Sequence, residues 1–408
     1  MAAVMETFET PASEEELAAV VRAAAAEGRA LVTECGGTKR HYGAAPPDGV
    51  RRVDLSRLSS VRHEPADMIL SVGAGAKLAE VRSVLAAHGQ WLPLDPPFVA
   101  ARASVGGVLA TGSSGPRRLG YGTAKDLLLG LRVVGAHGGV TKSGGRVVKN
   151  VSGYDLHRPQ VGAFGSLGVI VEAHFKVAAR PETSSLWALP CATLDDAHGL
   201  LLEIAASALR PVALEALDGA AADLVRARAP LPGAAGQAVA VVGIEGSRAV
   251  FERHARDLAT YAARGRGAPA LVERPTSDAL WEALAELPAM TAGDVRVRVG
   301  ARPHDLPALL SALELGREAA RASSVRVGTG VAHVALAARE GAPLATVVER
   351  WHRLASARDG YAVVESAPLD LPGRARLPFG APGAGRLHAA LRQAWDPKGL
   401  LNAGRMSP

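Results

Sequence analysis

The stretch between residues 103 and 177 concentrates glycine and small hydroxylated residues. It reads ASVGGVLATGSSGPRRLGYG at 103–122, GRVVKNVSGYDL at 145–156 and GAFGSLGVIVEAHFKV at 162–177. Because glycine has no Cβ, it adopts positive φ angles and lets backbone N–H groups approach a ligand that any side chain would hold away. We therefore expect this stretch to bind something large, flat and negatively charged, and a dinucleotide such as FAD fits that description.

The chain has 408 residues, more than one hydrophobic core usually serves, so about two domains are expected. Lysine and arginine outnumber aspartate and glutamate by 46 to 40, giving a net charge of +6. This excess is scattered along the sequence, which suits a phosphate-bearing cofactor or an acidic substrate. A nucleic-acid-binding protein is disfavoured because no basic stripe is interleaved with aromatic residues.

The cysteine content and the N-terminal segment indicate the compartment. Cys35 and Cys191 are too few for a disulfide scaffold and too far apart for a CxxC metal or iron–sulfur motif, so we expect no metal site. The acidic N-terminal segment lacks the plan of a signal peptide, and no apolar run reaches the ~18 residues of a spanning helix. These features predict a cytoplasmic protein that reaches the inner membrane only as a peripheral member of a complex, through partners.

The first third of the chain alternates helix and strand. Ser13 and Glu16 form a capping signature before an Ala-rich helix over 12–28, and a short strand over 30–35 follows. A further strand leads into a helix that begins near Lys77. From 103 to 177 we expect short, mostly extended elements.

A change in composition after 179–185 indicates a second domain. From 186 to about 365 the sequence alternates apolar strands (185–190, 237–246, 294–303 and 324–336) with Ala/Leu/Arg-rich helices (195–209, 247–265, 306–322 and 343–360). This alternation predicts an α+β substrate or cap domain. The chain then ends with a helix and a tight polar turn.

The segment Gly36, Gly37, Thr38 and Lys39 follows the predicted strand over 30–35. At the end of a strand such residues can present consecutive N–H groups to an anion such as a pyrophosphate. The alternative is an ordinary strand-to-loop turn. The nearby GAGAKL at 73–78 is not a dinucleotide fingerprint, because Leu78 occupies the third glycine position, and a strand-to-helix turn explains it better.

Two more clusters complete the pattern. Ser104, Gly106, Gly107, Thr111 and Gly112 lie about seventy residues after the first cluster, and Gly162, Gly165 and Gly168 recur at intervals of three. Glycine in a helix interior costs roughly 1 kcal/mol of stability relative to alanine. We therefore interpret the cluster of Gly162, Gly165 and Gly168, the third along the chain, as an extended segment against a planar ring. Together the clusters fit one elongated cofactor.

These motifs resemble the vanillyl-alcohol oxidase and p-cresol methylhydroxylase-type (PCMH-type) FAD-binding family. The resemblance rests on CGGTK at 35–39, GAGAKLAEV at 73–81, the 103–122 segment, KNVSGYDL at 149–156, GAFGSLGVI at 162–170 and DPKGLLNAGRM at 396–406. Within the family, SGPRR and GGRVVKNVSGYDL are similar to the FAD-binding subunits of bacterial glycolate oxidases. The likeness covers the first 180 residues and the last dozen.

The resemblance implies an α+β fold with a two-subdomain PCMH-type FAD-binding domain over 1–180. An α+β cap domain over 181–380 would be inserted before a C-terminal helix and turn over 381–408 that return to the FAD site. Thr38 stands where covalently flavinylated relatives carry histidine, so FAD would be non-covalent.

The resemblance also implies roles for individual residues. The backbone of 36–39 and of 104–107 would bind the pyrophosphate, the flavin ring would lie along 165–170, and Asn402 would return to its edge. The cofactor-binding candidates are Gly36, Gly37, Thr38, Lys39, Ser104, Val105, Gly106, Gly107, Thr111, Gly112, Gly165, Leu167, Gly168, Val169, Ile170 and Asn402.

The implied activity is oxidation of a small anionic 2-hydroxy acid such as glycolate or D-lactate, with electrons passed to an iron–sulfur subunit. One alternative is an FAD-binding relay subunit that depends on a catalytic flavin paralogue, and another is a basic module for nucleic acid or acidic surfaces. Related catalytic subunits carry a histidine-rich metal motif, whereas here the corresponding strand supplies only His333, which is also typical of a structural histidine.

The candidates for substrate contact are basic residues. Arg117 and Arg118 could bind a carboxylate bidentately or form a solvated turn. His157 and Arg158 after GYDL, and Arg405 beside Asn402, are further candidates. Oxidation also needs a base for the hydroxyl proton, and His157, His333 or a partner's residue could serve, but the sequence does not select among them.

Overall fold

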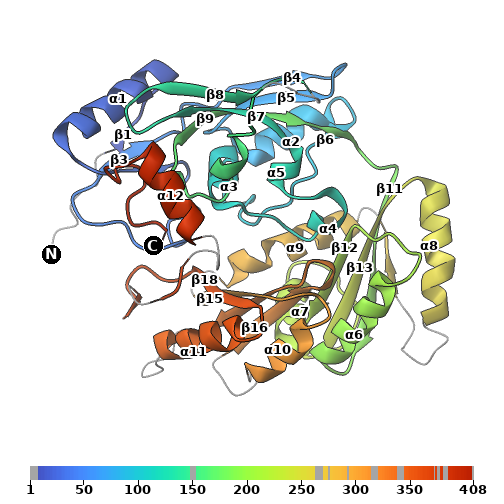
Figure 1. Ribbon diagram of the computed structural model, residues 1–408. Helices are drawn as coiled ribbons and strands as arrows, with labels where there is room; N and C mark the ends of the chain where they lie inside the picture. Colours follow the sequence, from blue (N-terminus) through green and yellow to red (C-terminus); the bar gives the residue numbers. More distant parts are fainter. Residues whose placement is uncertain are drawn as a thin grey trace. The chain divides into compact units, whose positions relative to one another are not determined.

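The computed structural model describes residues 8–147, 153–261, 270–273, 276–291, 294–313, 320–337, 344–371, 373–374, 377–379 and 385–406. These residues form two compact units (Figure 1). The first draws on Met1–Ser113, Thr123–Arg180 and Gly380–Pro408, and the second on Ser114–Gly122 and Pro181–Phe379. Both units mix helices and sheets, so the expected α+β class is confirmed.

The first unit begins with a small parallel sheet in the order β1-β3-β2, formed by Phe8–Glu9, Arg51–Asp54 and Leu31–Glu34. Helix α1 (Glu14–Glu27) starts where the Ser13 side chain accepts the Glu16 N–H and ends at Gly28 with φ 65°. Its buried face packs with Leu31 and with Leu401 from the far end of the chain. The predicted helix over 12–28 and strand over 30–35 are therefore confirmed.

The second sheet of this unit is antiparallel, in the order β4-β5-β9-β7-β8. Its strands are Val61–Glu64, Ile69–Gly73, Val169–Lys176, Leu128–Val134 and Val140–Gly144. Helices α2 (Leu78–Ala86) and α3 (Val105–Thr111) contribute Leu78, Val81 and Leu109 to a core with this sheet. Strands β6 (Gln90–Trp91) and β10 (Ala178–Ala179) form a separate pair. The start predicted for α2, near Lys77, is confirmed.

The second unit is built on an eight-stranded antiparallel sheet in the order β14-β11-β13-β12-β16-β17-β15-β18. The strands, in that order, are Ala270–Val272, Thr183–Cys191, Ala238–Gly246, Ala213–Leu217, Ala320–Arg326, Val331–Leu336, Val295–Gly300 and Tyr361–Ser366. Helix α6 (Leu194–Ala205) packs on β11, β12 and β13, and α11 (Leu344–Ser356) on β15 and β18. Helices α7 (Gly219–Arg226) and α9 (Thr276–Met290) pack on each other and share a core with Leu217 and Val239.

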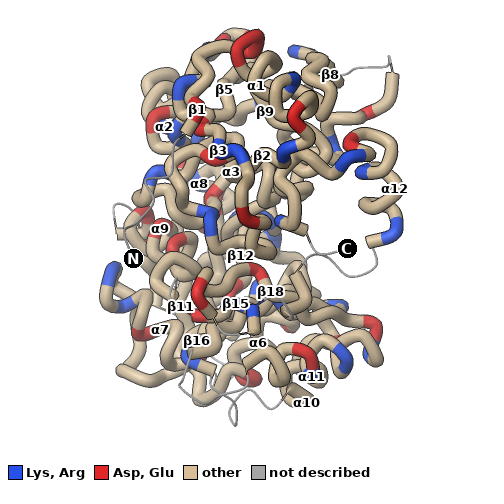
Figure 2. Tube along the Cα trace, turned by 90° about the vertical axis from the view of Figure 1, so that its left-hand side faces the viewer, with Lys and Arg blue, Asp and Glu red and all other residues tan. Residues whose placement is uncertain are grey.

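The remaining helices of the described chain are short or peripheral. They are α4 (Arg118–Tyr121), α5 (Ala124–Leu127), α8 (Arg248–Tyr261), α10 (Leu306–Ala312) and α12 (Gly385–Trp395), with 3-10 turns at Arg158–Gln160 and Val327–Thr329. Among the described residues, no helix combines the length and apolar character needed to cross a membrane. Lysine and arginine are interspersed with acidic residues along the trace in Figure 2, as the scattered charge in the sequence suggested.

Several sequence-based expectations for the elements are wrong. The strand expected over 324–336 is two strands, β16 and β17, because Gly330 turns the chain with φ 64°. The helix expected over 306–322 ends at Ala312, and β16 has begun by Ala320. The 103–177 stretch is not mostly extended, since α3, α4 and α5 lie in it. Strands β12 and β18 and helices α7 and α9 were not anticipated.

The segment 114–122 lies in the second unit, although its neighbours in sequence lie in the first. The Arg117 guanidinium donates to Glu245 at 2.8 Å and lies 3.9 Å over the Trp281 ring. The Ser184 hydroxyl donates to the same Glu245 carboxylate at 2.7 Å. Arg117 is therefore occupied by an internal ion pair, which argues against its expected role as the carboxylate-binding residue.

This ion pair provides a stability test. Glu245 has a side chain 1% exposed and Arg117 one 12% exposed. The substitution Glu245→Gln leaves Arg117 buried without its counter-charge and should lower the free energy of unfolding by about 3–5 kcal/mol. Denaturant unfolding followed by tryptophan fluorescence measures this loss. Glu252→Gln, which removes an exposed i,i+4 pair with Arg248, should cost no more than about 0.5 kcal/mol, and equal costs would contradict the prediction.

Candidate functional site

The loop after β2 presents backbone donors. Gly36 and Gly37 adopt φ angles of 55° and 69°, in the region that favours glycine. The Gly37 N–H donates to the Cys35 carbonyl at 2.6 Å. The N–H groups of Gly36 and Thr38 have no hydrogen-bond partner among the described residues. This loop, which we call the glycine loop (35–39), can therefore offer two amides to an anion.

Lys39 fixes the glycine loop rather than projecting from it. It is 9% exposed, and its Nζ donates to the Ser113 hydroxyl at 3.0 Å. The same ammonium lies 4.7 Å from the Tyr42 ring centroid and 4.8 Å from that of Phe98. Its carbonyl oxygen accepts a hydrogen bond from Arg405 at 2.9 Å. Arg405 is thus a support for the loop, which argues against its expected contact with substrate.

The second cluster forms the start of helix α3, and its amides are already used. Ser104 caps the helix by accepting the Gly107 N–H at 3.2 Å. The Val105 N–H donates to Ala76 at 3.0 Å, and the Gly106 N–H to Ala74 at 2.8 Å. The amides of Val105, Gly106 and Gly107 thus already have acceptors within the chain, and the expected backbone contact of 104–107 with a pyrophosphate stays a prediction. Gly106 is needed for packing, since a Cβ there would lie 2.8 Å from the Ala74 Cβ.

The first and second clusters lie close together in space. The Thr111 hydroxyl donates to the Gly107 carbonyl at 2.7 Å and lies 2.7 Å from the Ser113 hydroxyl. Ser113 in turn receives the Lys39 ammonium. A chain of polar contacts therefore links the glycine loop to the end of α3.

The third cluster lies against the same helix. The Gly162 N–H donates to the Leu109 carbonyl at 2.9 Å, and the Phe164 N–H to the Ala110 carbonyl at 2.8 Å. Gly112 has a φ of 59°, and a Cβ there would lie 3.3 Å from the Gly162 Cα, so the two glycines pack closely. The glycine spacing predicted an extended segment, and this prediction is wrong. Gly162, Phe164 and Gly165 have positive φ angles, and strand β9 begins only at Val169.

The remaining candidates on this loop are buried or packed. Leu167 is 3% exposed, Val169 1% and Ile170 5%. A Cβ on Gly168 would lie 3.2 Å from the Gln160 amide, so this glycine marks close packing.

Asn402 joins the C-terminal turn to two of these segments. Its Oδ1 accepts the Thr33 N–H at 3.0 Å, and its Nδ2 donates to the Gly165 carbonyl at 3.1 Å. In the same strand, the Leu31 N–H donates to the Leu400 carbonyl at 2.8 Å, so the C-terminal turn pairs with β2. The amide group is fully engaged, and Asn402 therefore positions the loop expected beneath the flavin.

His157 has a structural environment. It is 4% exposed, its backbone N–H donates to the Ser143 hydroxyl at 3.0 Å, and its Nδ1 lies 3.1 Å from the same oxygen. Burial lowers its pKa, so the ring is neutral at physiological pH. Arg158 pairs with Asp155 at 3.1 Å. Residues 149–152 of the KNVSGYDL motif lie outside the described residues.

A contact that the sequence did not indicate joins α12 to the third cluster. Ser166, fully buried, donates to the Ala163 carbonyl at 2.6 Å and lies 3.0 Å from His388 Nε2. Desolvation by burial lowers the pKa of His388, and the charge of Arg392 lowers it further. No local motif surrounds His388, so only the fold reveals this pair.

The second unit carries a polar cluster on the sheet face that α7 and α9 cover. Ion pairs join Glu215 to Arg326 at 3.6 Å and Glu365 to Arg296 at 3.9 Å, while His333 Nδ1 lies 3.5 Å from Glu365. We call these five residues and Arg298 the arginine cluster. Arg298 is the direct cross-strand neighbour of His333.

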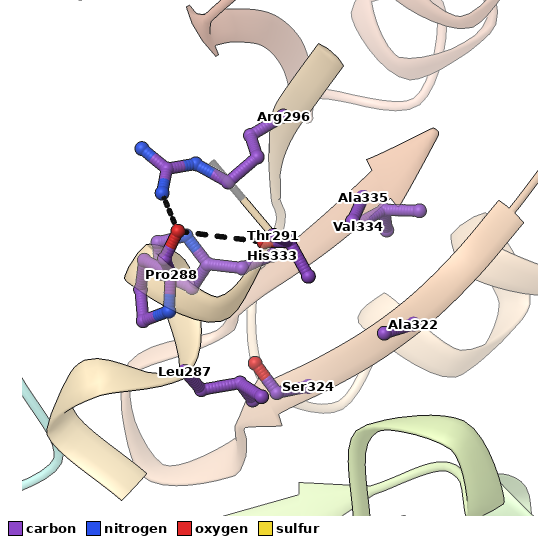
Figure 3. A pocket seen from close by; sticks show the side chains of 9 residues that line it. All are labelled: Leu287, Pro288, Thr291, Arg296, Ala322, Ser324, His333, Val334 and Ala335. Carbon is purple, nitrogen blue, oxygen red and sulfur yellow. Dashed lines mark hydrogen bonds between the residues drawn. The ribbon is translucent and has the colours of Figure 1, made fainter. Parts of the chain in front are cut away.

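A small cavity opens beside this cluster. It has a volume of about 20 Å³, room for one water, and Figure 3 shows Arg296 and His333 among its lining residues. Arg296 donates to the Pro288 carbonyl at the end of α9. Neither ring nitrogen of His333 has a hydrogen-bond partner. Within the described ranges, no three His, Cys, Asp or Glu side chains gather in a way that could hold a metal ion.

The charges of the cluster shift two pKa values. Burial lowers the pKa of His333 to about 4, and the nearby Arg326 charge adds to the effect. Burial alone would raise the pKa of Glu365, but His333, Arg296 and Arg298 together hold it well below its usual range. His333 is therefore neutral and Glu365 ionised at pH 7.

The neighbouring glycines of α3 allow a matched comparison. Gly106→Ala forces a Cβ against Ala74 and should lower the free energy of unfolding by about 1–3 kcal/mol. Gly107→Ala meets only the Ser104 hydroxyl, at 3.2 Å. It should change stability by at most about 1 kcal/mol, because the gain in helix propensity offsets the small shift. Thermal denaturation of the two variants measures the difference in stability. A larger loss of stability in Gly107→Ala than in Gly106→Ala would contradict the packing argument.

The buried His333 predicts a pH dependence of stability. Its pKa is about 4 in the folded chain against an ordinary value of 6.5, so the unfolded state binds the proton more tightly. The free energy of unfolding should therefore fall by up to about 1.4 kcal/mol per pH unit as the pH drops from 6.5 toward 4. Denaturant titrations at several pH values should show a smaller fall in His333→Asn, and parallel curves for the two proteins would refute the assignment.

Comparison with known sequences identifies both halves of the chain. Residues 6–144 match the FAD binding domain family, and residues 180–360 match the C-terminal domain of FAD linked oxidases. The chain is 40% identical over 124 residues to glycolate oxidase subunit GlcE of Escherichia coli, a match that covers 30% of this chain and 35% of that protein. It is 30% identical over 214 residues to D-lactate dehydrogenase of Archaeoglobus fulgidus, covering 52% and 48%. These matches span about a third to a half of the length of the curated relatives.

Comparison with solved structures supports the fold. An alkyldihydroxyacetonephosphate synthase superimposes on 97% of this chain and 75% of its own with a TM-score of 0.70, at 18% sequence identity. The glycine loop fits the cofactor that the family matches imply, because the Gly36 and Thr38 amides have no acceptor among the described residues and Gly36 and Gly37 adopt positive φ angles. The chain therefore combines a PCMH-type FAD-binding domain with a C-terminal domain of FAD linked oxidases, and its cofactor is FAD.

Proposed function

We propose that this chain oxidises a small 2-hydroxy acid of the glycolate or D-lactate type. The observation that carries the proposal is the arginine cluster, in which three arginines share one sheet face with two glutamates. Arg298 has no ion pair among the described residues, and its Nε lacks a hydrogen-bond partner. A half-buried cation without an ion pair favours an anionic ligand, because such a ligand would supply the missing counter-charge.

The chemistry of the cluster suits a hydroxy acid. A guanidinium binds a carboxylate through two parallel hydrogen bonds, which would fix the orientation of the acid. Neutral His333 and the ionised Glu365 carboxylate, 3.5 Å apart, would set the charge pattern beside that acid, while the buried ring nitrogens of His333 do not reach a ligand. Bound FAD supplies the two-electron acceptor. We assign carboxylate binding to Arg298.

For the cofactor we propose that the amides of the glycine loop contact the pyrophosphate, with Ser104, Thr111 and Gly112 forming the wall beside it. The flavin would lie along 165–170, held in place by Asn402. The absence of a histidine at Thr38 supports non-covalent binding. We also propose the domain limits 1–180, 181–380 and 381–408, with the 114–122 segment assigned to the second unit.

We propose that electrons leave the FAD for another subunit. The whole sequence contains only Cys35 and Cys191, too few to hold an iron–sulfur cluster, so an iron–sulfur relay must lie in a partner chain. A catalytic flavin paralogue is the second proposed partner, and membrane association would come through such partners. A relay role without substrate turnover is the competing function, favoured by the single histidine of the arginine cluster.

Anaerobic reduction of the FAD-loaded chain tests the function. Glycolate or D-lactate should bleach the flavin absorbance near about 450 nm, whereas acetate, which lacks the hydroxyl, should not. Arg298→Met should reduce the apparent second-order rate of bleaching by about 30-fold or more, since a charge-assisted pair is lost. Arg302→Met, at an exposed arginine just beyond the same strand, should retain the wild-type rate.

The outcomes separate the two functions. Bleaching only after addition of a purified catalytic paralogue would establish the relay role and refute turnover by this chain. Bleaching that is equal in wild type and Arg298→Met would refute the assignment of the carboxylate to the arginine cluster.

A further inference from the structure

Lys77 lies beside the glycine loop although it is about forty residues away in sequence. A Cβ placed on Gly36 would be 3.1 Å from the Lys77 Nζ and 3.0 Å from the Arg102 carbonyl oxygen. The ammonium group therefore lies against the backbone of Gly36. This proximity brings a cation to the loop that offers the two available amides.

Lys77 also adjoins the start of α3. Its backbone forms an isolated antiparallel bridge with Ser104, and the Val105 N–H donates to the preceding residue, Ala76. Cys35 lies between these segments, in contact with Ser104 and within the field of Lys77. The Lys77 ammonium is thus next to both segments that are expected to enclose the pyrophosphate.

The ammonium of Lys77 is available for a ligand. It makes no hydrogen bond and no ion pair in the described part of the chain, and the side chain is half-buried. The nearest acidic residues are occupied, since Glu34 pairs with Arg40 at 2.6 Å and Asp54 accepts from Ser56. Burial raises the pKa of the Cys35 thiol to about 11, so this group is neutral and supplies no counter-charge.

Lys39 differs from Lys77 because its ammonium group already has partners within the chain. Of the two lysines near the glycine loop, Lys39 is the one that belongs to the loop itself, yet its Nζ is held by Ser113 and by two aromatic rings. A positive charge that is already enclosed in this way gains little from a second partner. The counter-charge for a dianionic pyrophosphate must then come from another cation, and Lys77 is next to the loop.

We propose that Lys77 is a cofactor-binding residue that pairs its ammonium with the diphosphate of FAD. The inference rests on the proposed placement of the pyrophosphate at the glycine loop. A charge-assisted hydrogen bond to phosphate at a partly desolvated site contributes enough to change affinity by about 10-fold or more. Lys77 would thereby set both the affinity for FAD and part of its dependence on salt.

The test measures FAD binding to the full-length apoprotein by quenching of FAD fluorescence. Lys77→Met should raise the Kd for FAD by about 10-fold or more, and Lys77→Gln should do the same. Lys77→Arg should stay within about threefold of wild type, because the charge is retained. ADP, which carries the diphosphate without the flavin, should compete with FAD about 10-fold less well in Lys77→Met than in wild type.

Matched controls distinguish binding from folding. Lys125→Met, at an exposed lysine of the same unit, should leave the Kd unchanged. The denaturation midpoint of the Lys77→Met apoprotein should equal that of wild type, since no internal bond is lost. The dependence of FAD affinity on salt concentration should be weaker in Lys77→Met than in Lys125→Met.

Two results would overturn the inference. An FAD Kd within twofold of wild type in both Lys77→Met and Lys77→Gln refutes the pairing, as does weaker FAD binding with unchanged ADP competition. Gly37→Ala tests the glycine loop itself, because a Cβ is strained at its φ of 69°. If Gly37→Ala weakens FAD binding and Lys77→Met does not, the loop is correct and the Lys77 assignment is wrong. If neither variant changes FAD binding, the pyrophosphate lies elsewhere.

Discussion

The first unit depends on a junction made by residues from opposite ends of the chain. Asn402, with a positive φ of 45°, accepts from Thr33 and donates to Gly165, while its neighbours pair with β2. Closing so long a loop costs chain entropy that grows only slowly with its length. Once the junction is closed, the strand that precedes the glycine loop and the loop expected beneath the flavin are held by one amide group. Without the Asn402 amide, Thr33 of β2 and the loop at Gly165 would lose their direct link through the C-terminal turn.

Three basic residues that the sequence offered for ligand binding are used inside the fold. Arg117, Lys39 and Arg405 all look available in the sequence, yet each is used inside its own unit: Arg117 by Glu245, Lys39 by Ser113 and Arg405 by the glycine loop's carbonyl groups. A cation that is paired and buried stabilises the scaffold and loses most of its capacity to attract a ligand. The cations that remain for ligands are those with fewer internal partners. Lys77 lies in the GAGAKLAEV motif, where the sequence indicated only the start of a helix, and Arg298 lies in no motif.

The sequence was informative where function depends on backbone geometry. Positive φ angles at Gly36, Gly37, Gly112 and Gly165 follow directly from glycine in short loops, and these positions were identified without a structure. It was less informative where the reason for glycine is packing, as at Gly106 against Ala74. Local patterns also could not show that β16 and β17 are separate strands or that 114–122 joins the second unit, because both depend on contacts between distant residues. The Ser166–His388 contact was missed for the same reason.

The two units solve the problem of binding an anion in different ways. The first uses backbone amides, whose partial charges need no counter-ion when the ligand is absent, and adds a lysine that stays half in contact with solvent. The second buries formal charges, and it reduces the cost by pairing Arg326 with Glu215 and Arg296 with Glu365. Arg298 is the exception to this pairing among the described residues. Its half-buried guanidinium lies 5.7 Å from the Tyr361 ring centroid and has no ion pair in the described part of the chain, so we propose that a ligand supplies the negative charge there.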